Sequence, residues 1–204
     1  MKNEQTEFIS HRVNTLAELK KIPAEYGVEL DLRDDLTGRI YIQHTPFEDG
    51  EDFEPYAAEY GANHRGTMIL NVKSERIEHK VLEIVKKCGI KRYFFLDSSF
   101  PMIKLLSDNG ERNIAVRFSE YEGMDTVRAM AGKINWVWVD TFTHLPIDKR
   151  TFDEMKNLGY RLCLVSPELQ GQGEKIEAYK KQIADMGITF DAICTKSYNI
   201  SKWR

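Results

Sequence analysis

The feature that most constrains the fold is a regular alternation of short apolar runs with amphipathic stretches of helical period. Eight runs of four or five mostly apolar residues have the composition of buried β-strands. They cover residues 8–11, 28–32, 68–72, 93–97, 114–118, 136–140, 162–166 and 191–195. Because strands that alternate with helices form parallel sheets, the pattern predicts an α/β protein.

Helical stretches lie between these strands and complete eight strand–helix units. They are predicted at residues 15–26, 52–60, 77–87, 102–107, 125–131, 148–158 and 174–186, with no full helix after 195. Eight units favour a compact (β/α)8 TIM barrel over an open doubly wound sheet. No G-x-G-x-x-G motif follows the first strand, which argues against a dinucleotide site. With no linker in the sequence, we expect a single domain over residues 1–204.

Composition excludes several other classes of protein. The 204 residues are 42% hydrophobic and 30% charged, which is typical of a globular domain rather than a disordered chain. A net charge of −3 argues against nucleic-acid binding. No run is long enough to span a membrane, and the opening residues show no apolar signal-peptide core, so we expect a cytoplasmic protein. Three cysteines far apart in apolar runs predict reduced, buried thiols.

Polar residues gather at the carboxyl ends of the predicted strands, where a barrel of this kind holds its active site. Glu29 and Asp31 are two apart on one strand and therefore face the same side. Two such carboxylates repel each other unless a cation separates them, either a divalent metal or the side chains of Arg12 and Lys73. With the Asn71 carbonyl they form an oxygen-rich set that suits Mg²⁺ or Ca²⁺. An ion-paired structural cluster is the alternative.

Two histidines lie at the same end of the predicted barrel. His11 closes the first strand, and His44 follows a short extended run at 39–43. Imidazole titrates near neutral pH, so such a pair can act as general base and general acid. Arg117 and Trp138, on later strands, are further candidates for binding substrate.

These residues and their order resemble the superfamily of glycerophosphodiester phosphodiesterases and phosphatidylinositol-specific phospholipases C. The resemblance covers residues 8–73 and the last strand. It rests on His11-Arg12, Asn14-Thr15, Glu29-x-Asp31, Gly38 six residues before His44, and Asn71-x-Lys73. The sequence departs from the pattern at Asn71, where most members have glutamate, and it lacks the long insertion after the second histidine.

The resemblance implies a TIM-barrel enzyme, a phosphoric diester hydrolase that requires a divalent cation. It implies that His11 and His44 are the acid/base pair, without saying which is the base. Glu29, Asp31 and Asn71 would be the metal ligands, and Arg12 and Lys73 would stabilise phosphate charge. The substrate would be a small soluble phosphodiester, such as a glycerophosphodiester, that is hydrolysed or cyclised.

Two other functions remain open at this stage. A Schiff-base aldolase would use Lys73 as an inward-facing nucleophile, but the neighbouring carboxylates argue against it. A catalytically degenerate barrel would bind a phosphorylated or sugar ligand without turnover. Fold resemblance alone does not decide between the enzyme and this alternative.

Overall fold

A computed structural model describes residues 6–204 of the chain. Residues 1–5 lie outside the described part. They belong to the opening segment, for which the sequence predicts no signal-peptide core. The described chain divides into two compact units. The N-terminal unit is Ile9–Leu106, and the C-terminal unit comprises residues 6–8 and 107–204. The single-domain organisation stays a prediction.

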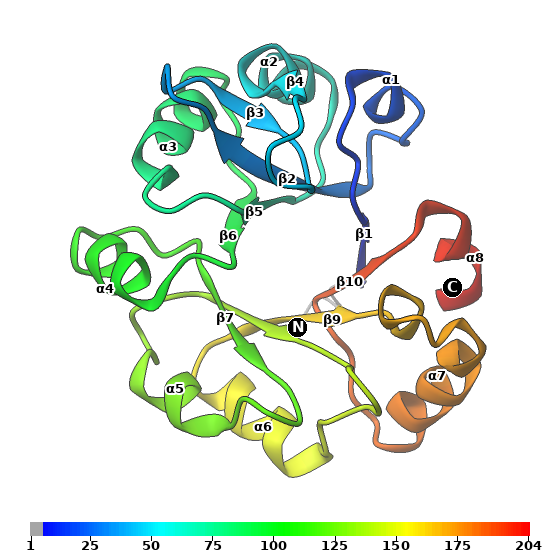
Figure 1. The fold of residues 1–204 in the computed structure, drawn as a ribbon. Helices are drawn as coiled ribbons and strands as arrows, with labels where there is room; N and C mark the ends of the chain where they lie inside the picture. The colour runs from blue at the N-terminus through cyan, green and yellow to red at the C-terminus, as the bar shows by residue number, and fades with distance from the viewer. Residues whose placement is uncertain (1–5) are drawn as a thin grey trace. The chain divides into compact units, whose positions relative to one another are not determined.

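The N-terminal unit contains four parallel strands followed by helices (Figure 1). Its elements in order are β1 (Glu7–Ser10), α1 (Leu16–Leu19), β2 (Gly27–Asp34), β3 (Ile40–Ile42), β4 (Glu51–Asp52), α2 (Phe53–Asn63), β5 (Met68–Val72), α3 (Glu78–Lys87), β6 (Tyr93–Leu96) and α4 (Phe100–Asp108), the first and last of which cross the unit boundary. Strands β1, β2, β5 and β6 pair in parallel in that order. Strand β3 pairs with β2 in the antiparallel sense, and β4 with β3.

The C-terminal unit repeats the same plan. Its elements are β7 (Ala115–Phe118), α5 (Met124–Ala129), β8 (Trp136–Val139), α6 (Lys149–Asn157), β9 (Arg161–Val165), α7 (Ile176–Asp185), β10 (Ala192–Thr195) and α8 (Ile200–Trp203). Short 3₁₀ turns cover Pro167–Gln170, Gly173–Lys175 and Ser197–Asn199. Strands β7, β8, β9 and β10 pair in parallel in chain order.

All eight predicted strands are present, with bounds that differ by no more than two residues from those expected. Of the predicted helices, the one at 15–26 is wrong beyond its first turn, because α1 ends at Leu19. Thr15 and Glu18 form the capping box that starts α1. Pro23 disfavours helical backbone at the residue before it, which prevents the helix from continuing. All three cysteines are free, as predicted, and Cys163 and Cys194 are buried. The expectation of burial is wrong for Cys88, which is only half-buried.

Among residues 6–204, no helix combines the length and the apolar character needed to cross a membrane.

Candidate functional site

The buried oxygen cluster of the N-terminal unit lies on β2 and β5. Glu29 and Asp31 share one face of β2, and Asp31 stands in register with Asn71 on β5. All three side chains are buried, with exposed fractions of 1%, 1% and 7%. The strands thus bring together the three residues that the sequence predicts as metal ligands.

Glu29 is held by three groups. Its Oε1 accepts a hydrogen bond from Nδ2 of Asn71 at 2.8 Å, and its Oε2 accepts one from the backbone amide of Arg12 at 2.7 Å. Nε2 of His11 lies 3.6 Å from the same Oε2. Burial raises the pKa of Glu29 to about 7, and the charge of Asp31 acts in the same direction, against the hydrogen bonds from Asn71 and Arg12.

Asp31 is surrounded by donors and cations. Asn14 binds it twice, since Nδ2 donates to Oδ2 at 2.9 Å while Oδ1 accepts from the Asp31 amide at 3.1 Å. Nε of Arg12 lies 3.6 Å from Oδ2, and Nζ of Lys73 lies 3.7 Å from Oδ1. Asp31 therefore connects the oxygen cluster to both predicted phosphate-binding cations.

Lys73 also contacts Asp97, which follows β6. Its Nζ donates to Oδ2 of Asp97 at 3.2 Å. Asp31 lies on the other side, so the Nζ atom is engaged by two carboxylates. An amine held in this way is not available to attack a substrate carbonyl, which argues against the aldolase alternative.

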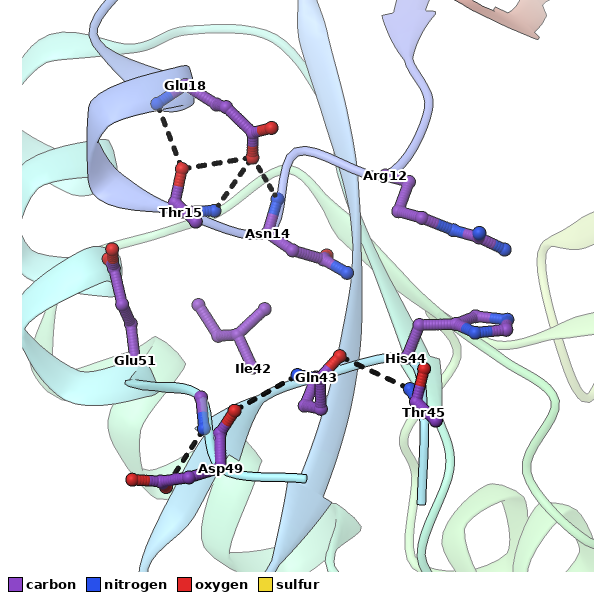
Figure 2. Close-up of a pocket in the computed structure, with 11 residues that line it drawn as sticks. Arg12, Asn14, Thr15, Glu18, Ile42, Gln43, His44, Thr45, Asp49 and Glu51 are labelled. Atoms are coloured by element: carbon purple, nitrogen blue, oxygen red, sulfur yellow. Dashed lines mark hydrogen bonds between the residues drawn. The ribbon is translucent and has the colours of Figure 1, made fainter. Parts of the chain in front are cut away.

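His44 belongs to the same site. Desolvation is the largest cause that lowers its pKa, and the cations Arg12 and Lys73 act in the same direction, while Asp31 opposes them. The lowered pKa favours the neutral imidazole, which can accept a proton. His44 lines one pocket with Arg12 (Figure 2), and its backbone carbonyl is held by Arg33.

Two positioning residues were missed by the sequence reasoning. Arg33 donates from Nη2 to the carbonyl oxygen of His44 at 2.7 Å and from Nη1 to that of Lys73 at 3.1 Å, so it fixes both segments. Asn14 enters the sequence prediction only as part of the Asn14-Thr15 element of the resemblance, with no role assigned to it. The signal for Arg33 was present, because positions 29, 31 and 33 share one face of β2.

The backbone is strained at two residues of the site. Arg12 has φ 55° and Asp97 has φ 61°, in the left-handed region that residues other than glycine rarely occupy. Such conformations cost about 1–3 kcal/mol each and tend to occur at functional sites. Here Arg12 lies beside Asp31, and Asp97 accepts a hydrogen bond from Lys73, which also contacts Asp31.

The donor chemistry of the cluster fits a hard divalent cation. No group of three or more His, Cys, Asp and Glu side chains suited to a metal occurs within residues 6–204. The two carboxylates of Glu29 and Asp31 would therefore need the side-chain carbonyl of Asn71 as the third oxygen ligand to a metal. The Oδ1 atom of Asn71 is buried and has no hydrogen-bond partner among the described residues. A cation of the Mg²⁺ or Ca²⁺ type would satisfy this atom and offset the two carboxylates.

The two remaining candidates, Arg117 and Trp138, belong to the C-terminal unit. They stand in register on β7 and β8 and therefore share a face. Nη1 of Arg117 pairs with Oδ2 of Asp140, whose Oδ1 accepts from Nε2 of Gln170 at 2.8 Å. Trp138 is buried, and its Nε1 has no hydrogen-bond partner in the described part of the chain. Their role in substrate binding stays a prediction.

No family model matches the sequence, and no curated protein does either. Solved structures do resemble it. A protein of Agrobacterium tumefaciens strain C58 assigned as a glycerophosphoryl diester phosphodiesterase superposes with a TM-score of 0.70 at 14% identity, covering 98% of this chain and 97% of that one. A glycerophosphodiester phosphodiesterase of the same strain gives 0.65 at 15% identity, with 93% and 96% covered.

A glycerophosphoryl diester phosphodiesterase of Parabacteroides distasonis ATCC 8503 gives a TM-score of 0.69 at 11% identity, covering 100% of this chain and 87% of that one. These likenesses extend over nearly the whole chain, and they define an α/β protein of the TIM-barrel class, as the sequence predicts. The particular fold is that of the glycerophosphodiester phosphodiesterases. The resemblance seen in the sequence is thus confirmed at the level of fold.

Proposed function

We propose that the protein is a metal-dependent phosphodiesterase that hydrolyses, or cyclises, a small phosphodiester such as a glycerophosphodiester. The observation that carries the proposal is the arrangement around Asp31. Cations from Arg12 and Lys73 lie within 4 Å of one buried carboxylate. His44 lines one pocket together with Arg12. Phosphodiester cleavage needs this combination of positive charge and groups that transfer protons.

Within this site, each side chain has a task that its surroundings support. Arg12 and Lys73 neutralise the charge of the phosphate and orient it. One imidazole of the pair His11 and His44 removes the proton from the attacking hydroxyl, which belongs to water or to a neighbouring group of the substrate. The other gives a proton to the oxygen of the departing alcohol, so that charge is balanced on both sides of the phosphorus.

Glu29, Asp31 and Asn71 would hold the divalent cation. When bound, Mg²⁺ or Ca²⁺ supplies Lewis-acid polarisation of a phosphoryl oxygen. Asn14 holds the Asp31 carboxylate, and Arg33 holds the backbone carbonyls of His44 and Lys73, so both residues preorganise the site.

The test is turnover of a panel of phosphodiesters with and without Mg²⁺ or Ca²⁺. The panel contains several glycerophosphodiesters, a sugar-linked diester and bis-p-nitrophenyl phosphate. We expect metal-dependent cleavage that His11→Ala and His44→Ala each reduce by at least about 10²-fold, since a general acid or base contributes about that much or more. His79→Ala is the matched control, because His79 is exposed on α3, away from the cluster.

Failure of the wild-type protein to cleave any diester would favour the alternative, a barrel that binds a phosphorylated or sugar ligand. Stabilisation of the fold by Mg²⁺ or Ca²⁺ is then measured separately by thermal unfolding. Cleavage that persists in both histidine variants would contradict the assigned acid/base pair.

A further inference from the structure

Asp97 is a charged residue beside the oxygen cluster that has no part in the acid/base or metal chemistry proposed above. It follows β6 directly, in the N-terminal unit, and its side chain is partly buried. Its φ of 61° lies in the left-handed region, where aspartate and asparagine occur more often than other residues with side chains. With this backbone conformation, the carboxylate of Asp97 reaches the ammonium group of Lys73, which follows β5.

Lys73 lies between two carboxylates but forms a hydrogen bond with only one of them. Its Nζ donates to Oδ2 of Asp97 at 3.2 Å, whereas Oδ1 of Asp31 lies 3.7 Å away, beyond hydrogen-bond distance. Within residues 6–204, the hydrogen bond to the carboxylate of Asp31 comes from Nδ2 of Asn14 and reaches Oδ2. Oδ1 of Asp31 therefore keeps lone pairs that a cation can use.

The contact between Lys73 and Asp97 is fixed by the backbone around both residues. Nη1 of Arg33 donates to the carbonyl oxygen of Lys73 at 3.1 Å and holds the chain where the lysine side chain begins. Oγ of Ser99 donates to Oε1 of Glu75 at 2.6 Å and joins the segment after β6 to the segment after β5. Each partner of this bond lies two residues after a member of the charged pair. The pair is therefore supported by the fold on both of its strands.

The ammonium group of Lys73 and a metal ion would compete for Asp31. A divalent cation in the oxygen cluster would repel the ammonium group, because both are positive. The lysine then needs a carboxylate other than Asp31, and Asp97 already supplies it. Without Asp97, Asp31 would be the one carboxylate of the described residues left within 4 Å of Nζ. The ammonium group would then pair with Oδ1 and obstruct the metal.

We propose that Asp97 is a positioning residue of the divalent-cation site: it holds the ammonium group of Lys73 away from Oδ1 of Asp31 and so leaves that oxygen to the metal. The inference rests on the proposed function for the presence of a cation at this site. Asp97 does not bind the metal and acts through Lys73. It also keeps Lys73 beside the site, where the lysine can neutralise the charge of a phosphate.

The test is a double-mutant cycle on the Mg²⁺ dependence of thermal unfolding. The Mg²⁺ concentration that gives a set rise in melting temperature reports the affinity for the metal. Asp97→Asn keeps the size of the side chain and suits the left-handed backbone but removes the charge. We expect it to need about tenfold more Mg²⁺ than wild type, within the range of couplings measured between residues in contact. In a Lys73→Met background the same substitution should change the requirement by less than about twofold, because no ammonium group is left to compete.

Two further variants control for charge and for folding. Asp34→Asn removes the same charge from an exposed position at the end of β2, where no contact with Lys73 is made, and should leave the Mg²⁺ requirement within about twofold of wild type. Asp97→Gly also suits the left-handed backbone and carries no acceptor, so it must weaken Mg²⁺ binding at least as much as Asp97→Asn. Melting temperatures in EDTA show that each variant folds.

Three results would overturn the role of Asp97. Equal weakening by Asp97→Asn with and without Lys73 would mean that Asp97 attracts the metal directly. A lower melting temperature with an unchanged Mg²⁺ requirement would mean that Asp97 only supports the fold. Retained Mg²⁺ affinity in Asp97→Gly would mean that the carboxylate is not needed.

Turnover of the diester panel separates this inference from the proposed function. Coupled Mg²⁺ binding without turnover of any diester supports the role of Asp97 and contradicts the phosphodiesterase. Turnover without coupling between Asp97 and Lys73 overturns the role of Asp97 and leaves the phosphodiesterase standing. A wild-type protein with neither an Mg²⁺ effect nor turnover contradicts both.

Discussion

The side-chain amide of Asn71 donates to Oε1 of Glu29 at 2.8 Å, while its own carbonyl oxygen is buried without a partner among residues 6–204. A buried acceptor left unsatisfied costs about 1–3 kcal/mol. Asn71 therefore makes one hydrogen bond within the cluster and leaves one buried acceptor oxygen unsatisfied. A divalent cation at Glu29, Asp31 and Asn71 would satisfy that oxygen.

Replacing Asn71 should change metal affinity in opposite directions according to the substituent. Asn71→Asp adds a third carboxylate, so we expect Mg²⁺ to stabilise the fold at about tenfold lower concentration, a change of about 1.4 kcal/mol. The same variant should melt at a lower temperature without metal, because three buried carboxylates repel one another and the bond to Glu29 is lost. Asn71→Leu, which has no carbonyl, should lose the Mg²⁺ effect.

Thermal unfolding at increasing Mg²⁺ concentration provides the measurement. Asn109→Asp adds the same charge at an exposed turn and serves as the control. An Mg²⁺ dependence that is the same in all four proteins would exclude Asn71 as a ligand.

How much of the site could be predicted from the sequence depends on whether a residue's role is set by strand alternation or by a contact between loops. The shared face of Glu29 and Asp31 follows from the two-residue period of a strand, and the parallel pairing that places Asn71 opposite Asp31 follows from the strand–helix alternation. The two hydrogen bonds between Asn14 and Asp31 could not be predicted, because they depend on how the chain turns after β1. The early end of α1 was likewise missed, since Pro23 outweighed an amphipathic pattern.

Glu78 is a second buried group whose substitution has a clear expected result. It is 0% exposed at the start of α3, and neither carboxylate oxygen has a hydrogen-bond partner among the described residues. Because a buried polar group without a partner destabilises the fold, we expect Glu78→Met to raise the free energy of unfolding by about 1–2 kcal/mol. Glu83→Met, exposed on the same helix, should change it by less than about 0.5 kcal/mol. Urea denaturation measures both, and a loss of stability in Glu78→Met would show that the carboxylate has a partner after all.

Phe47 presents strain at the surface. It is fully exposed, yet its φ of 67° lies in the left-handed region. That conformation costs a bulky residue about 1–2 kcal/mol, and glycine avoids it at an entropic cost of about 0.5–1 kcal/mol. We therefore expect Phe47→Gly to be more stable than wild type by about 0.5–1 kcal/mol in chemical denaturation.

Leu36 is the matched control, since it is equally exposed and its φ is not positive. Leu36→Gly should be less stable by about 0.5 kcal/mol, because it only adds freedom to the unfolded chain. Equal effects of the two substitutions would mean that the backbone at Phe47 carries no strain.

The stability of the C-terminal unit should depend on pH through Glu120. Oε1 of Glu120 accepts from the amide of Thr143 at 2.6 Å, from its hydroxyl at 2.9 Å and from the amide of His144 at 3.2 Å. Burial alone would raise the pKa of Glu120, but these bonds together outweigh it and lower the pKa from 4.5 to about 2. Since the pKa is lower in the folded state, Glu120 stabilises the fold fully above pH 4.5 and loses this contribution as the pH falls towards 2. We expect Glu120→Gln to be less stable than wild type at pH 7 and the difference to shrink between pH 4.5 and 2 in urea denaturation, whereas Glu25→Gln, at an exposed position, should track wild type throughout. A difference that stays constant over this range would show that the charge of Glu120 adds nothing beyond the hydrogen bonds that a neutral amide can accept.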